Sequence, residues 1–189
     1  MTPKEALQKD KYLIVEDFIS QKDCEGLYNY FKQDLKNNPE LFNSDPQSPI
    51  AASIHNYRWF VELLVAANPF ISKLVEEPTI PTYTYSRLYY KGADLKPHKD
   101  RPSCEVSVTL NIKGDPWAIY FEKPDKSISE VILKPGHAVV YHGMEASHWR
   151  EKFEGEECLQ VFLHYVKSRG EHWEHYFDIK HNYLSQPSR

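Results

Sequence analysis

Apolar residues recur at helical spacing near the start of the chain. Leu27, Tyr30 and Phe31 fall on one stripe of a helix that Ser20 can cap. The segment ends at a Lys-Asn-Asn-Pro break over residues 36–39, because proline cannot continue a helix. These positions predict an amphipathic helix between Ser20 and the break.

A second helix is predicted over residues 56–74, with a break at Asn68-Pro69. Its apolar stripe consists of Phe60, Leu63, Leu64 and Ala67. The short apolar run over residues 11–18 predicts a strand. Residues 42–50 carry two prolines, and we expect a connecting loop there.

After residue 80 the helical period disappears, and short strands separated by Gly or Pro replace it. The first strand opens at Tyr83, a Gly-containing turn follows at residues 91–94, and a second extended piece carries His98 and Asp100. Further strands are predicted over residues 105–112, 117–121, 129–133, 138–141 and 158–166. Such a series is typical of a mainly β fold, and we expect a jelly-roll-like or cupin-like barrel of about seven or eight strands with helices outside.

Length and composition agree with one domain over residues 1–189, made of N-terminal helices (1–80), a barrel core (81–167) and a C-terminal tail (168–189). The tail is expected to pack back as a helix. Aromatic residues make up 14% of the chain and there are 13 prolines, which suits strands and turns. The net charge of −4 disfavours nucleic acid as a partner.

The three cysteines have no zinc-finger or disulfide spacing. Met1 to Asp10 is charged, unlike a signal peptide, and no apolar run is long enough to span a bilayer. A cytoplasmic protein that does not associate with a membrane is therefore the expectation.

A metal site is predicted from His98 and Asp100. Side chains two residues apart in a strand point the same way, so this imidazole and this carboxylate can converge on one ion. Two histidines compete for the third ligand: His142 ends a strand beside a turn, whereas His148 opens a later extended segment. We favour His148, because such a segment can return a side chain to the barrel interior. Together with His98 and Asp100 it would make a two-histidine, one-carboxylate face that leaves three positions open on Fe(II).

The sequence resembles the 2-oxoglutarate- and Fe(II)-dependent dioxygenases, and within them the prolyl-4-hydroxylase-like branch. The residues that carry the resemblance are Tyr89-x-x-Gly92, His98-x-Asp100 and Pro135-Gly136 ahead of His148. The resemblance implies a double-stranded β-helix and an enzyme that uses Fe(II), 2-oxoglutarate and O2 to hydroxylate a C–H bond. It implies a peptide, protein or small-molecule substrate, such as a prolyl or other peptide side chain.

One departure from the family concerns the cosubstrate. Members usually place Arg or Lys nine or ten residues after the distal histidine, and counting from His148 leads to Glu157 and Cys158. Counting from His142 instead leads to Lys152. With His148 as ligand, the cation that holds 2-oxoglutarate must come from elsewhere.

Arg87 is the first choice for that cation, because it shares a strand face with Tyr85 and Tyr89. Arg150 is the second, because it shares a face with His148. The guanidinium can fork onto a carboxylate while tyrosine hydroxyls add donors. Gln160 and His164 alternate on the last strand and would line the same pocket if that face points inward.

Several features have simpler interpretations. Arg101 points away from the metal by alternation and either reaches substrate or pairs with Glu105. Barrel packing explains Trp117, Tyr120 and Phe121, and solvated or capping roles explain His172, His175 and His181. The rival functions are a non-catalytic cupin-like barrel that binds a metal or small ligand, and nucleic-acid demethylation, which the acidic balance disfavours.

Overall fold

The computed structural model describes residues 2–178 of the chain. Its helices are α1 (Pro3–Asp10), α2 (Gln21–Asn37) and α3 (Arg58–Val75), with short 3-10 turns at Pro39–Leu41, Pro102–Cys104 and Trp173–Asp178. Its strands are β1 (Tyr12–Val15), β2 (Asn43–Asp45), β3 (Ser48–His55), β4 (Thr79–Tyr90), β5 (Leu95–His98), β6 (Val106–Gly114), β7 (Ile119–Glu122), β8 (Ile128–Val131), β9 (Ala138–Tyr141), β10 (Ser147–Arg150) and β11 (Glu157–Lys167).

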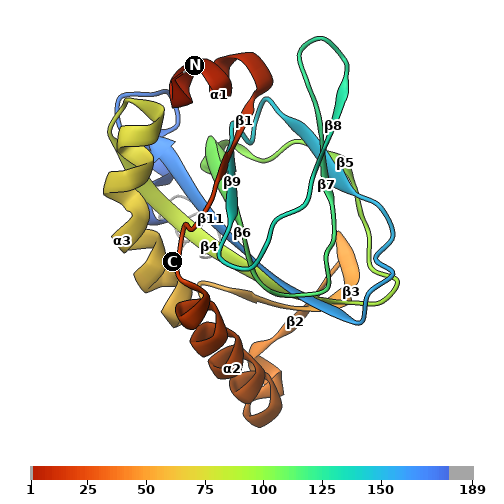
Figure 1. The fold of residues 1–189 in the computed structure, drawn as a ribbon. Coiled ribbons are helices and arrows are strands. Elements are labelled where there is room, and N and C mark those ends of the chain that lie inside the picture. Colours follow the sequence, from red (N-terminus) through yellow and green to blue (C-terminus); the bar gives the residue numbers. More distant parts are fainter. Residues whose placement is uncertain (1, 179–189) are drawn as a thin grey trace, which may run out of the picture.

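Two antiparallel sheets face each other. The larger has the strand order β1-β9-β6-β11-β4-β3-β2, and the smaller has the order β5-β10-β7-β8. From β4 onward the chain passes between the two sheets, so that each sheet receives four of these strands. This is a double-stranded β-helix, which confirms the predicted jelly-roll barrel. Figure 1 shows α2 and α3 on one side of the larger sheet and the smaller sheet on the other.

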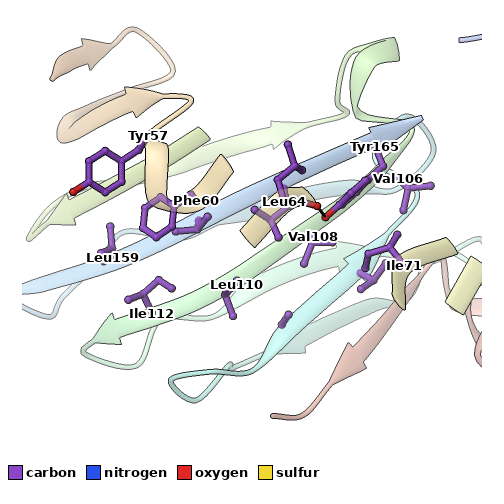
Figure 2. Close-up of a cluster of buried hydrophobic side chains, with 14 of the residues drawn as sticks. Tyr57, Phe60, Leu64, Ile71, Val106, Val108, Leu110, Ile112, Leu159 and Tyr165 are labelled. Atoms are coloured by element: carbon purple, nitrogen blue, oxygen red, sulfur yellow. Dashed lines mark hydrogen bonds between the residues drawn. The ribbon is translucent and has the colours of Figure 1, made fainter. Parts of the chain in front are cut away.

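The alternation along β11 decides what each face of the larger sheet contacts. Leu159, Val161, Leu163 and Tyr165 belong to the core beneath the helices, whereas the residues between them point into the barrel. The Tyr165 hydroxyl donates a 2.9 Å hydrogen bond to the carbonyl of Leu64 in α3. Figure 2 shows Phe60, Leu64 and Ile71 of α3 against Val106, Val108 and Leu110 of β6. Each such buried side chain contributes about 1.5–3 kcal/mol of hydrophobic free energy.

The predicted cap of α2 is confirmed, but the predicted break in α3 is wrong. The Ser20 hydroxyl accepts a hydrogen bond from the Asp23 amide at 3.1 Å. Helix α3 continues through Pro69 to Val75. Proline removes one backbone hydrogen bond, but Ile71 and Leu74 beyond it are buried against the sheet, and that packing outweighs the loss.

The segment predicted to be a loop over residues 42–50 instead contributes to a hairpin. Strand β2 pairs with β3, and β3 pairs with β4 through Ala51 opposite Tyr89 and Ser53 opposite Arg87. Pro46 lies in the turn and Pro49 lies beside the start of β3, where a missing N–H is tolerated. The hairpin therefore extends the larger sheet beyond the barrel.

The two ends of the chain also differ from expectation. Residues 3–10, for which no helix was predicted, form α1 with Thr2 and Glu5 in a capping box. The tail forms a 3-10 turn with non-helical angles at Tyr176 and Phe177, and the predicted helical continuation, with His181, lies outside the described residues. Within residues 2–178, no helix is both long and apolar enough to cross a bilayer.

Candidate metal centre

Three side chains from the smaller sheet and the loop after β5 meet at one point. His98 ends β5, Asp100 follows it, and His148 lies directly opposite His98 in β10. The carboxylate oxygen Oδ1 of Asp100 lies 3.8 Å from Nε2 of His98 and 3.7 Å from Nε2 of His148. One potential ligand atom from each residue lies within 4.8 Å of the other two, so the three can hold one metal ion.

Both imidazoles are oriented by their own strands. Nδ1 of His98 donates to the carbonyl of Lys96 at 2.8 Å, and Nδ1 of His148 donates to the carbonyl of Ala146 at 3.0 Å. Because the proton is held on Nδ1, the lone pair is on Nε2, which faces Asp100. Each ring is therefore in the tautomer that a metal requires.

Asp100 is fixed by groups that the sequence analysis did not single out. Its Oδ2 accepts from the Ser107 hydroxyl at 2.8 Å, and its amide donates to the Gly143 carbonyl at 2.9 Å. The signal for Ser107 was present in β6, where Ser107, Thr109 and Asn111 alternate with apolar residues and point into the barrel. Oδ1 remains directed at the two imidazoles.

A side chain at position 143 would displace the carboxylate. A Cβ there would lie 2.5 Å from Oδ2 of Asp100 and 2.7 Å from the Ser107 hydroxyl, with the Cys104 carbonyl closer still. We expect Gly143→Ala to lower the free energy of unfolding by about 3 kcal/mol and to weaken metal binding. Urea unfolding and metal titration would measure both effects.

Gly26→Ala in α2 is the matched control, because no atom lies within 4 Å of the new methyl group. It should raise the free energy of unfolding by about 0.5–1 kcal/mol through helix propensity. Equal effects of the two substitutions would contradict the steric argument.

Burial favours the neutral form of His148 and His164. It lowers the pKa of His148, against the opposing attraction of Asp100. It also lowers the pKa of His164 to about 4; Nδ1 of this ring lies 3.0 Å from the Ser107 hydroxyl. Hydrogen bonds thus link the side chains of Asp100, Ser107 and His164.

The depressed pKa of His164 predicts a loss of stability in acid. The unfolded chain takes up a proton near the ordinary pKa of 6.5, whereas the folded chain resists it down to about 4, so stability falls across that window as the pH falls. Between pH 7.5 and 5.0 this group should cost about 2 kcal/mol. Urea unfolding of the metal-free protein at the two pH values would measure it.

His164→Gln should remove that share of the pH dependence, whereas His137→Gln should keep it. His137 is also partly buried, and Asp17 lies 3.8 Å from its ring. An unchanged pH dependence in His164→Gln would contradict the prediction.

His142, the rival ligand, lies elsewhere. Its amide donates to the Lys11 carbonyl at 3.1 Å, and its side chain lines a separate cavity of about 120 Å³ with Lys4, Leu7 and Glu76. Lys152, the cation that would accompany it, is exposed in the loop between β10 and β11. The structure brings His148, and not His142, to the other two residues.

The triad opens into a cavity of about 400 Å³. Tyr85, Arg87, Arg150 and His164 are among the residues that line it. Two other residues predicted to bind the cosubstrate, Tyr89 and Gln160, are buried outside this lining, with 0% and 2% of their surface exposed.

Arg87 is already paired. Its guanidinium donates to Asp45 at 2.5 Å and to Gln47 at 2.8 Å, both from the β2–β3 hairpin, and to the Tyr89 hydroxyl at 3.1 Å. Burial opposes the charge of Arg87, but Tyr89 and Asp45 outweigh it and raise the pKa. Asp45 also accepts from the Tyr85 hydroxyl at 2.9 Å.

Arg150 has no acid beside it within the part of the chain that the structure describes. Its guanidinium donates to the Trp117 carbonyl at 2.7 Å and to the Gln160 side chain at 3.3 Å, while Nε has no partner there. The residue is 3% exposed, and burial lowers its pKa. A buried cation without a counter-ion, facing a cavity, is prepared for an anion.

Glu157 and Cys158 are the positions at which the dioxygenases that the sequence resembles usually carry Arg or Lys, and neither can bind the cosubstrate carboxylate here. Glu157 points to α2, where it contacts Tyr28 and forms an ion pair with Lys32 at 2.7 Å. Cys158 is buried, and its thiol lies 2.9 Å from the Gln160 amide.

Solved structures share this fold. A prolyl-4-hydroxylase from Pseudomonas putida is 18% identical, with 88% of this chain and 97% of that chain covered and a TM-score of 0.68. HygX from Streptomyces hygroscopicus, solved with nickel and 2-oxoglutarate bound, is 11% identical over 87% and 86% of the chains, with a TM-score of 0.71. The α-ketoglutarate-dependent carbocyclase SnoK from nogalamycin biosynthesis is 9% identical over 98% and 90%, with a TM-score of 0.77.

Neither a family model nor a curated protein matches the sequence. At these low identities the similarity to solved structures establishes the fold. The resemblance noted from the sequence is thus confirmed at the level of architecture.

Proposed function

We propose that the chain is an Fe(II)- and 2-oxoglutarate-dependent oxygenase that hydroxylates a C–H bond. The observation that carries the proposal is that two imidazole nitrogens and one carboxylate oxygen converge at a cavity that is also lined by Arg150, a buried cation with no acid beside it among the described residues. This donor set would hold Fe(II) through three protein ligands and would leave room on the ion for 2-oxoglutarate and dioxygen.

The residues that line the cavity fit both Fe(II) and 2-oxoglutarate. His98, Asp100 and His148 would hold the metal, because their donor atoms converge and Nδ1 of each histidine is bonded away from it. The bound metal and 2-oxoglutarate would together activate dioxygen, which is the oxidant. The chain's own part is to orient the ligands, keep the buried His148 imidazole neutral and limit access to the cavity.

We propose Arg150, rather than Arg87, as the cation that holds the far carboxylate of 2-oxoglutarate. Asp45 neutralises Arg87, whereas Arg150 has no acid of its own among the described residues. Gln160 would orient the Arg150 guanidinium, Tyr89 would support Arg87, and Tyr85 and His164 would form part of the wall. A guanidinium can then meet the carboxylate with two donors.

The cavity of about 400 Å³ suits the cosubstrate together with a small molecule or one side chain of a peptide. Solved neighbours include a prolyl-4-hydroxylase and HygX with hygromycin B bound, so both kinds of substrate occur on this fold. Lys99 and Arg101, which also line the cavity, favour a substrate that carries a negative charge.

Adding Fe(II) and 2-oxoglutarate without oxygen should produce a weak visible charge-transfer band, and His98→Ala should abolish it. Absence of the band in the intact protein would overturn the proposal. With oxygen admitted, succinate release distinguishes an oxygenase from a barrel that only binds metal, which should release none.

A further inference from the structure

Arg101 stands at the mouth of the cavity in a fixed position. Its Nε donates to the Tyr83 hydroxyl at 3.2 Å, and its guanidinium carbon lies 4.4 Å from the centre of the Tyr83 ring. Tyr83 is itself 8% exposed, and its hydroxyl lies 3.0 Å from the Cys104 thiol. The guanidinium therefore rests on a buried ring, although 42% of the Arg101 side chain is exposed.

Strand alternation predicted that Arg101 points away from the metal. The backbone leaves the regular strand after His98, and Arg101 lines the same cavity as the metal triad. Glu105, the partner considered from the sequence, instead forms an ion pair with Lys167 at 3.4 Å.

A buried acid lies behind Arg101. Asp178 of the C-terminal 3-10 turn is 1% exposed, and its carboxylate lies 3.7 Å from a terminal nitrogen of Arg101 and 3.4 Å from Nε2 of His55. Neither Asp178 oxygen has a hydrogen-bond partner within residues 2–178. Asp178 thus attracts the guanidinium from the protein side without occupying its donors.

The terminal nitrogens of Arg101 make no hydrogen bond to any described residue. Three arginines line the cavity, and the other two are engaged or enclosed: Arg87 is paired with Asp45, and Arg150 is 3% exposed. Arg101 is therefore the most exposed of the three, and its terminal nitrogens are not used in hydrogen bonds to described residues, although one of them lies 3.7 Å from Asp178. Lys99 lines the mouth as well and adds a second positive charge.

We propose that the substrate carries a carboxylate, which Arg101 binds at the mouth of the cavity. The proposal rests on the oxygenase function proposed above and specifies its substrate class. The Arg101 guanidinium lies against the Tyr83 ring, and its two terminal nitrogens can both donate to one carboxylate. Because Arg101 lines the same cavity as His98, Asp100 and His148, a small acid held there would lie in the cavity into which the metal site opens.

The test uses matched probes: N-acetyl amino acids of several side chains and their primary amides, which differ by one charge at nearly equal size. The intact protein is loaded with Fe(II) and 2-oxoglutarate without oxygen, and each probe is titrated while the visible band is followed. We expect the acids to half-saturate at concentrations about tenfold lower than the amides, because a charge-assisted pair replaces a neutral hydrogen bond.

Arg101→Gln should reduce this preference to within about twofold, and Arg101→Lys should retain part of it. Arg58→Gln is the matched control, since Arg58 also lies over an aromatic ring, Trp59, at 4.2 Å, but outside the cavity lining. It should keep the full preference.

Three results would overturn the proposal: amides that bind as well as acids, a preference that survives Arg101→Gln, or a panel in which no acid perturbs the band. Each requires the band itself to be present in the unmodified protein. Failure of the oxygenase proposal is recognised earlier, because the band would then be missing before any probe is added.

Discussion

Replacing His148 with alanine should weaken Fe(II) binding by more than about 100-fold and abolish succinate formation. Loss of a residue that only supports a ligand costs about 10- to 100-fold in affinity, so loss of a ligand should cost more. His142→Ala should leave metal affinity unchanged, because that side chain lines a different cavity. Calorimetric titration with Fe(II) under nitrogen would compare the two variants.

The pair of substitutions decides between the two histidines that the sequence left in competition. Thermal unfolding of both metal-free variants should show that each still folds. Retained metal affinity in His148→Ala, with loss in His142→Ala, would reverse the assignment and with it the geometry of the site.

Replacing Arg150 with glutamine should raise the dissociation constant of 2-oxoglutarate by about 100-fold, since it removes a charged pair to the far carboxylate from a buried site. Binding of 2-oxobutanoate, which lacks that carboxylate, should change little. Arg150→Gln should also raise the free energy of unfolding, because a buried charge without a counter-ion is removed. The visible band measures cosubstrate affinity and urea unfolding measures stability.

A cation that binds the cosubstrate should show both effects: Arg150→Gln should weaken 2-oxoglutarate binding and raise the free energy of unfolding. Loss of a cation that stabilises the fold should instead lower the free energy of unfolding. If Arg87 were the anchor, Arg150→Gln would leave the affinity for 2-oxoglutarate unchanged. A stabilised protein with full affinity would therefore move the assignment back to Arg87.

Much of the barrel could be predicted because its determinants are local. Alternation along residues 158–166 and the Gly and Pro separators identified the strands after residue 80. His98 and Asp100 lie on one side as expected, although Asp100 is in the loop after β5, and the pairing of β10 with β5 brings His148 to them. These predictions needed only the period of a strand and the position of its ends.

The rest depended on contacts between distant segments. The hairpin of β2 and β3 was missed because its prolines suggest a loop, and pairing with β4 decides its conformation. The ranking of Arg87 above Arg150 could not anticipate Asp45, which reaches Arg87 from that same hairpin. Likewise, Asp178 and Arg101 are far apart in the sequence, and only the fold brings them together.

Asp45 and Gln47 form part of the cavity wall, yet they belong to the β2–β3 hairpin, which is added outside the barrel. Insertions or exchanges in this segment can remodel the entrance without disturbing the strands that carry the metal triad. The entrance of the cavity and its metal triad are thus formed by separate parts of the chain.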